Sequence, residues 1–106
     1  MPDAQGRTTE LELSEIVLDI LYDNGIGRST FRNLIREIPK RITLTIVDEV
    51  VSDKRPSERL WEQRVRNISS HRKTEGNFIL EGFLIKINGG LQLTDAGRIR
   101  VKNRRN

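Results

Sequence analysis

The dipeptide Asn88-Gly89 lies between two short apolar runs, Phe83–Ile87 and Leu91–Leu93. Asn-Gly between apolar runs is the strongest short-range signal for a β-hairpin, because a tight two-residue turn needs residues that tolerate positive φ. We therefore expect two strands joined by a tight turn, with both central residues at positive φ. A late hairpin in a chain whose other segments have helical periodicity restricts the fold to a mixed α+β class.

Two helices are expected in segment 1–40. Thr9 and Glu12 have the spacing of a capping box, and Asn24-Gly25 is a typical helix stop. A second helix should follow Ser29 and end at Pro39. The apolar residues that recur at helical spacing are Leu13, Ile16, Val17, Ile20 and Leu21, then Phe31, Leu34, Ile35 and Ile38.

The middle of the chain is less regular. Alternation over 41–45 predicts a very short strand. Thr45 can cap a short helix over 46–51, although the β-branched residues there leave a strand open. Ser57 is a good N-cap for a helix that runs to about Ser70, and Thr94-Asp95 can open a final helix.

This order predicts an α+β fold that is mainly α. We expect a winged helix-turn-helix with additional N-terminal helices and a two-stranded β wing. Residues 1–8 should be a flexible tail, and residues 9–106 a single domain, since 106 residues suit one modest core.

Charge is unevenly distributed along the sequence. Lys and Arg total 19 against 15 Asp and Glu, which gives a net charge of +4. Segment 54–73 has seven basic residues and two acidic ones, and segment 98–106 has five basic residues and none acidic. The charged side chains of segment 1–25 are mostly acidic. A polarised charge distribution of this kind favours a polyanionic partner.

Several classes of protein are disfavoured. The chain has no cysteine and one histidine, so disulfides and thiolate metal sites are excluded and a zinc site is not expected. It has no apolar run long enough to span a bilayer, and Met1–Thr8 lacks the apolar stretch of a signal peptide. No acid–base or nucleophile constellation is evident. We expect a cytoplasmic binding module without cofactors, metal or catalytic residues.

The basic helix over about 57–70 carries the chemistry of DNA recognition. An α-helix fits the major groove, where Arg pairs with guanine and Asn or Gln with adenine. The residues predicted to read bases are Arg59, Gln63, Arg64, Arg66, Asn67 and Ser70. The alternative is a solvated face in which Glu58 and Glu62 pair with arginines one turn away.

Other residues have two interpretations each. Trp61 can form an aromatic methyl pocket, but its spacing with Val65 and Ile68 favours the core. His71 can contact a phosphate or close the end of the helix. The residues predicted to hold phosphates are Lys54, Arg55, His71, Arg72, Lys73, Lys86 and Asn88.

Three motifs together resemble a known family. Trp61, Val65-Arg66-Asn67 and Ser70-His71-Arg72 share one helix, Gly76-Asn77-Phe78-Ile79 follows, and Leu93-Thr94 precedes Gly97-Arg98. This pattern resembles the winged-helix reader modules of modification-dependent, HNH-type restriction endonucleases, functionally like the methyladenine-reading domain of DpnI. The resemblance covers about residues 42–98. It implies a module that binds double-stranded DNA and senses N6-methyladenine, with the nuclease domain elsewhere in the parent chain.

Other functions compete with this one. A winged-helix transcription regulator would dimerise and bind an unmethylated operator. A protein-interaction module would tolerate charge reversal of Arg59, Arg64 and Arg66. A small nuclease is disfavoured, because neither HNH histidines nor a PD-x-K core is present.

Overall fold

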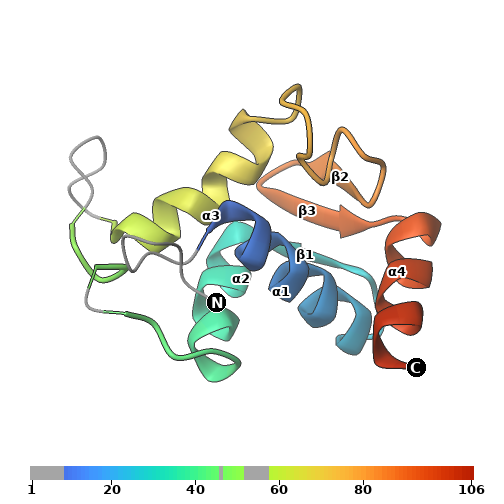
Figure 1. The fold of residues 1–106 in the computed structure, drawn as a ribbon, viewed down its shortest axis with the longest axis horizontal. Coiled ribbons are helices and arrows are strands. Elements are labelled where there is room, and N and C mark those ends of the chain that lie inside the picture. The colour runs from blue at the N-terminus through green and yellow to red at the C-terminus, as the bar shows by residue number, and fades with distance from the viewer. Residues whose placement is uncertain (1–8, 46, 52–57) are drawn as a thin grey trace.

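The computed structural model describes residues 9–45, 47–51 and 58–106 (Figure 1). Lys54, Arg55 and Ser57, along with the expected tail over 1–8, lie outside the described residues. The described elements, in chain order, are α1 (Glu10–Asp23), β1 (Arg28–Thr30), α2 (Phe31–Glu37), the 3₁₀ helix η1 (Ile38–Lys40), α3 (Leu60–Ser70), β2 (Leu84–Ile87), β3 (Gly90–Leu93) and α4 (Asp95–Arg105).

The strands form one antiparallel sheet in the order β1-β3-β2. Leu91 of β3 is in register with Ser29 on one side and Lys86 on the other. Helix, strand, two helices and a hairpin succeed one another as in a winged helix, so the expected fold class is confirmed. The N-terminal helices expected before α3 are α1 and α2.

Helix α1 begins and ends where the sequence predicts. Thr9 and Glu12 form the reciprocal bonds of a capping box, with the Glu12 amide 3.0 Å from Thr9 Oγ1. At the other end, Asn24 Oδ1 accepts hydrogen bonds from the amides of Ile26 and Gly27. Gly25 has φ +82°, as a helix stop requires.

The strand expected over 41–45 is absent, and the strand of the N-terminal half is β1 instead. The helix expected near 46–51 was also wrong for the described residues 47–51. These form a turn in which the Val50 amide donates to Val47 O, and Val51 then bridges to Arg59. Thr45 does cap this turn, because its hydroxyl oxygen accepts from the Asp48 amide. The β-branched segment 47–51 is short, and its contacts with the start of α3 determine its conformation.

The hairpin forms as expected, but its turn differs in detail. Gly89 has φ +72°, whereas Asn88 does not have positive φ, so the expectation for both central residues was wrong. The next residue must also be glycine, because a Cβ on Gly90 would lie 2.0 Å from Ser29 O of β1. The Phe31 amide donates to Gly89 O at 2.9 Å. The wing is therefore a tight turn beside the first residue of α2.

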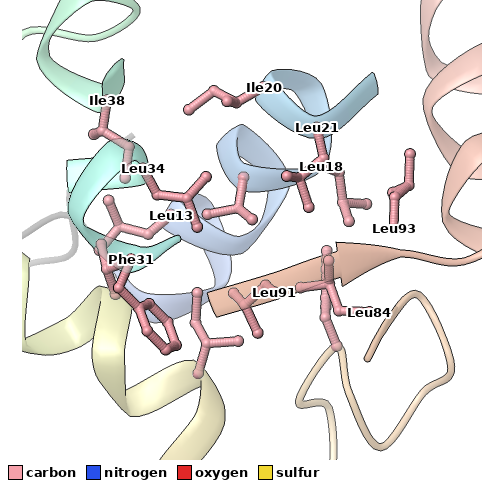
Figure 2. Close-up of a cluster of buried hydrophobic side chains, with 14 of the residues drawn as sticks. Leu13, Leu18, Ile20, Leu21, Phe31, Leu34, Ile38, Leu84, Leu91 and Leu93 are labelled. Atoms are coloured by element: carbon pink, nitrogen blue, oxygen red, sulfur yellow. The ribbon is translucent and has the colours of Figure 1, made fainter. Parts of the chain in front are cut away.

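The core lies between α1, α2, α3 and β3. Figure 2 shows leucines of α1 pointing between α2 and the strand that carries Leu91 and Leu93. Trp61, Val65 and Ile68 add the inner face of α3 to the same cluster. At about 25 cal/mol per Å² of buried apolar area, these side chains supply most of the folding free energy. They also fix the rotation of α3 about its axis, which decides which side chains it exposes.

Candidate nucleic-acid interface

Helix α3 is positioned by core contacts on one face and by neighbours on both flanks. Trp61 is 4% exposed, and Val65 and Ile68 are fully buried. The helix packs against α1 on one side and α2 on the other. At 100° per residue, the side opposite the core carries Arg59, Gln63, Arg66 and Ser70, of which Arg66 contacts Glu58 and, on α2, Phe31. The rotation predicted from the sequence is therefore correct.

The start of α3 is tied to the preceding turn. The first amides of a helix have no partner within the helix. Here the Leu60 amide donates to Val50 O at 2.7 Å and the Trp61 amide to Asp48 O at 3.3 Å. The Arg59 amide donates to Glu62 Oε1 at 2.9 Å. These amides are used within the fold, so side chains must make the contacts of this helix with any ligand.

Trp61 does not form a surface methyl pocket. Its ring belongs to the hydrophobic cluster that includes Val65 and Ile68, and only 4% of the residue is exposed. The core interpretation of its spacing is confirmed, and the alternative is corrected. A base on the surface of α3 has no access to this indole ring.

Arg66 links α3 to α2 and is the most constrained of the predicted base-reading residues. Its guanidinium pairs with the carboxylate of Glu58 and lies 5.7 Å from the centre of the Phe31 ring. Glu58 is mostly buried in this pair. A base contact by Arg66 would break both interactions, so we assign it a positioning role. Arg59 is less constrained, because it is half exposed and 3.9 Å from Glu49.

A hollow of about 280 Å³ lies on the flank of α3 that faces α1. Four of the predicted residues, Gln63, Arg64, Asn67 and His71, meet there. His71 Nδ1 is 2.9 Å from Glu10 Oε1, which joins the end of α3 to the start of α1. The other residues that line the hollow are Glu10 and Leu60. The sequence did not predict Glu10 and Leu60 as part of the site, since the first lies on another helix and the second was assigned only to a flank.

Among the residues that the structure describes, the predicted phosphate-binding side chains do not form one cluster. Arg72 donates to Ser69 O at 3.1 Å and closes the end of α3, while Lys73 is exposed just beyond it. Lys86 and Asn88 are exposed on the hairpin. His71 is engaged with Glu10. These residues surround α3 and the hairpin without converging on one point.

Two further arginines lie near the hairpin, one opposite Gln92 of β3 and one next to Phe31, whose amide donates to Gly89 O. Arg28 opens β1 and Arg32 lies in the first turn of α2, and both are exposed. Neither has an ion-pair partner among the residues that the structure describes. The sequence pattern carries no signal for them, because β1 is too short to show a period. Both arginines add positive charge near the start of α2.

Three of the five basic residues in segment 98–106 are neutralised within the fold. Arg100 bonds Glu15 at 2.8 Å, Arg104 bonds Asp19 at 3.0 Å, and Arg105 bonds Asp23 at 2.9 Å. We call these contacts the α1–α4 seam. The expected polarity of charge is thereby corrected, because the acidic face of α1 and the basic face of α4 cancel each other.

Asp23 is the carboxylate most affected by the seam. The hydrogen bond from Arg105, followed by that from Arg41, lowers the pKa of Asp23 from 3.8 to about 2. The same bond raises the pKa of Arg105 above its ordinary value. Both groups therefore stay charged at neutral pH, and neither contributes uncompensated charge to a ligand.

Comparisons with protein-family models, curated proteins and solved structures return no match for this chain. Within the described residues, no group of three or more His, Cys, Asp or Glu side chains could hold a metal ion. Over the same residues, none of the helices combines the length and apolar character needed to cross a bilayer. The functional argument therefore rests on the geometry and chemistry of α3 and its surroundings.

Proposed function

We propose that this domain binds double-stranded DNA with α3 in the major groove. The observation that carries the proposal is the division of α3 into two faces. Trp61, Val65 and Ile68 anchor one face in the core, while Arg59, Gln63 and Asn67 lie toward the other. An exposed helix with guanidinium and carboxamide groups matches the hydrogen-bonding pattern of base edges in that groove.

The distribution of charge supports the same ligand. The carboxylates of Glu15, Asp19 and Asp23 on α1 are engaged by α4 in the seam, at the opposite end of the molecule from α3 (Figure 1). Exposed cations next to α3 and the hairpin include Lys73, Lys86, Arg28 and Arg32. Phosphate contacts by such residues give DNA affinity that falls steeply with salt.

The finer proposal follows from the family resemblance. Such a module would read N6-methyladenine in DNA for a modification-dependent restriction endonuclease, with the nuclease domain elsewhere in the parent chain. Because Trp61 is buried, the side chains that contact a methyl group must come from elsewhere on α3. Duplexes with and without N6-methyladenine in GATC test this proposal, and tenfold tighter binding of the methylated form supports it.

The first test is a fluorescence-anisotropy titration of duplex DNA with matched charge reversals. Arg59→Glu and Arg64→Glu change the exposed side of α3, whereas Lys102→Glu makes the same charge change on α4. We expect each α3 variant to bind at least tenfold more weakly and the Lys102 variant to bind nearly as the wild type does. Equal losses in all three would mean that only net charge matters, and the assignment of α3 would be wrong.

One observation favours a second candidate, a dimeric transcription regulator that binds an unmethylated operator. Ile99 of α4 is 58% exposed and borders a hollow of about 610 Å³ that Phe83 and Ala96 also line. An exposed apolar surface of this kind is common where subunits meet. Light scattering coupled to size exclusion distinguishes the candidates: a stable dimer favours the regulator, and a monomer favours the isolated reader module.

A further inference from the structure

The hollow beside α3 combines one apolar wall with polar and charged groups. Leu60 supplies the apolar wall, and Asn67 and Gln63 supply carboxamides. The carboxylate of Glu10 lies on the same rim, held by His71 at 2.9 Å. Arg64 and His71 also line the hollow, so its charge is mixed, and the Glu10 carboxylate is the group in it that repels phosphate and favours hydrogen-bond donors. The hollow is therefore better suited to the edge of a base with an exocyclic amino group than to the DNA backbone.

Asn67 is available to bind such an edge. Its carboxamide makes no hydrogen bond to the part of the chain that the structure describes. By contrast, the carboxamide of Asn77 bonds Ile68 O and the amides of Ile79 and Leu80. Asparagine can bond adenine at N6 and N7 together, and an apolar side chain can contact the methyl group of the paired thymine.

We infer that this hollow receives the major-groove edge of an A·T pair, with Asn67 on adenine and Leu60 against a methyl group. The inference rests on the proposed DNA binding. With guanine on Asn67, the O6 acceptor would face the Glu10 carboxylate. In the reverse orientation the amino group of cytosine would satisfy Glu10, but a G·C pair offers neither the N6–N7 edge that Asn67 bonds nor a methyl group for Leu60. Two methyl groups can supply this contact: that of thymine, which leaves both bonds between Asn67 and adenine intact, and that of N6-methyladenine, which leaves Asn67 only the bond to N7 because the remaining amino hydrogen is used in the base pair.

The test compares duplexes of equal length that differ only in base-pair edges. An A·U duplex lacks the thymine methyl group, and an I·C duplex has the major-groove edge of G·C with the minor groove of A·T. We expect A·T to bind at least tenfold more tightly than I·C or G·C. One buried methyl group predicts about a fourfold difference between A·T and A·U. A duplex with N6-methyladenine and uracil shows whether adenine's methyl group replaces thymine's.

Surface variants test the two residues separately, with matched controls on α4. Leu60→Ala should remove the dependence on either methyl group, and Asn67→Ala should remove the preference for A·T over I·C. Ile99→Ala and Asn103→Ala change the same kinds of residue at the other end of the molecule and should leave both preferences intact. Circular dichroism checks that each variant is folded.

The possible outcomes distinguish a failure of this inference from a failure of the proposed DNA binding. No binding to any duplex would reject DNA binding itself. Salt-dependent binding that is equal for all duplexes would keep DNA binding and overturn the A·T edge. Equal affinity for the I·C and A·T duplexes would also overturn the A·T edge, because the preference would then come from the minor groove. An affinity that neither methyl group increases would overturn the contact with Leu60.

Discussion

Two asparagines on or just after α3 have opposite roles, and burial separates them. Asn77 is 7% exposed, and its carboxamide donates to Ile68 O at 2.8 Å and accepts from the Ile79 amide at 2.8 Å. It therefore closes the last turn of α3 and orients the segment that leads to β2. Asn67 lies in the hollow without such contacts to the described part of the chain. The motif that resembles reader modules thus includes both a structural and a candidate binding asparagine.

We predict that Asn77→Ala lowers the free energy of unfolding by about 2 kcal/mol, because it leaves the Ile68 carbonyl and the Ile79 amide without a buried partner. Asn67→Ala is the matched control and should be neutral or slightly stabilising, since alanine is the better helix former. Urea denaturation monitored by Trp61 fluorescence measures both. Equal destabilisation by the two variants would contradict the division of roles.

At the scale of elements, the caps, the apolar periodicity and the turn residues of the sequence predicted the helices and the hairpin that depend on neighbouring residues. The capping box of α1, the apolar face of α3 and the hairpin over 84–93 were predicted from nearby residues. Strand β1 was missed because so short a segment becomes a strand only by pairing with β3, which lies near the other end of the sequence. The turn over 47–51 was missed because it is shaped by the bridge from Val51 to Arg59.

The same reasoning applies to the candidate site. Periodicity placed Gln63 and Asn67 correctly, because both lie on one helix. It could not bring Glu10 to the hollow, because the contact with His71 joins residues 61 positions apart. It also could not show that the arginines of α4 are neutralised, since their partners lie on α1. Sequence reasoning found the candidate reading helix, and tertiary contacts determined which of its cations are accessible.

Close packing of β1 on β3 predicts different costs for two adjacent glycines. A Cβ on Gly90 would overlap the backbone of Ser29, so Gly90→Ala should lower the free energy of unfolding by about 3 kcal/mol or more. A Cβ on Gly89 would meet nothing within 4 Å, and only its φ of +72° opposes alanine. Gly89→Ala should therefore cost about 1 kcal/mol. Chemical denaturation of both variants tests this order, and the reverse order would show that β1 is not held as described.

The α1–α4 seam predicts a pH dependence of stability. The pKa of Asp23 is lowered to about 2 in the folded chain from an ordinary value of 3.8. A lowered pKa contributes stability that is present above the ordinary value and is lost as pH falls toward 2. Because Asp23 is more than a third exposed, screening limits the contribution to about 0.5–1 kcal/mol.

The measurement is urea denaturation of the wild type and Asp23→Asn at pH 6 and pH 2. At pH 6 we expect the wild type to have a larger free energy of unfolding than Asp23→Asn. At pH 2 this difference between the two proteins should shrink toward zero. Glu75→Gln removes an exposed carboxylate that has no ion pair within the described residues and should show no such change. A constant difference at both pH values would mean that the seam does not hold Asp23 ionised.

At the scale of the whole molecule, the basic residues of α4 and those near α3 and the hairpin differ in how many ion pairs they make. Helix α4 buries only Gly97 and Val101, and three of its four arginines pair with α1. Arg100 also lies over the rings of Phe78 and Phe83, at 5.0 and 4.8 Å from their centres. Basic residues near α3 and the hairpin have fewer such partners among the described residues. Net charge alone would assign DNA binding to either end, whereas the ion pairs favour the end with α3.

This difference predicts how the salt dependence of DNA binding responds to substitution. Each phosphate contact adds about 0.9 to the slope of log K against log salt concentration. Replacing Arg104 and Arg105 by glutamine removes two cations from the seam and should lower stability slightly while leaving the slope unchanged. Arg28→Gln with Arg32→Gln removes the same charge beside the hairpin and should reduce the slope by about 1–2. If the Arg104 and Arg105 variant instead reduced the slope of log K against log salt concentration, α4 would contact DNA and the proposed orientation would be reversed.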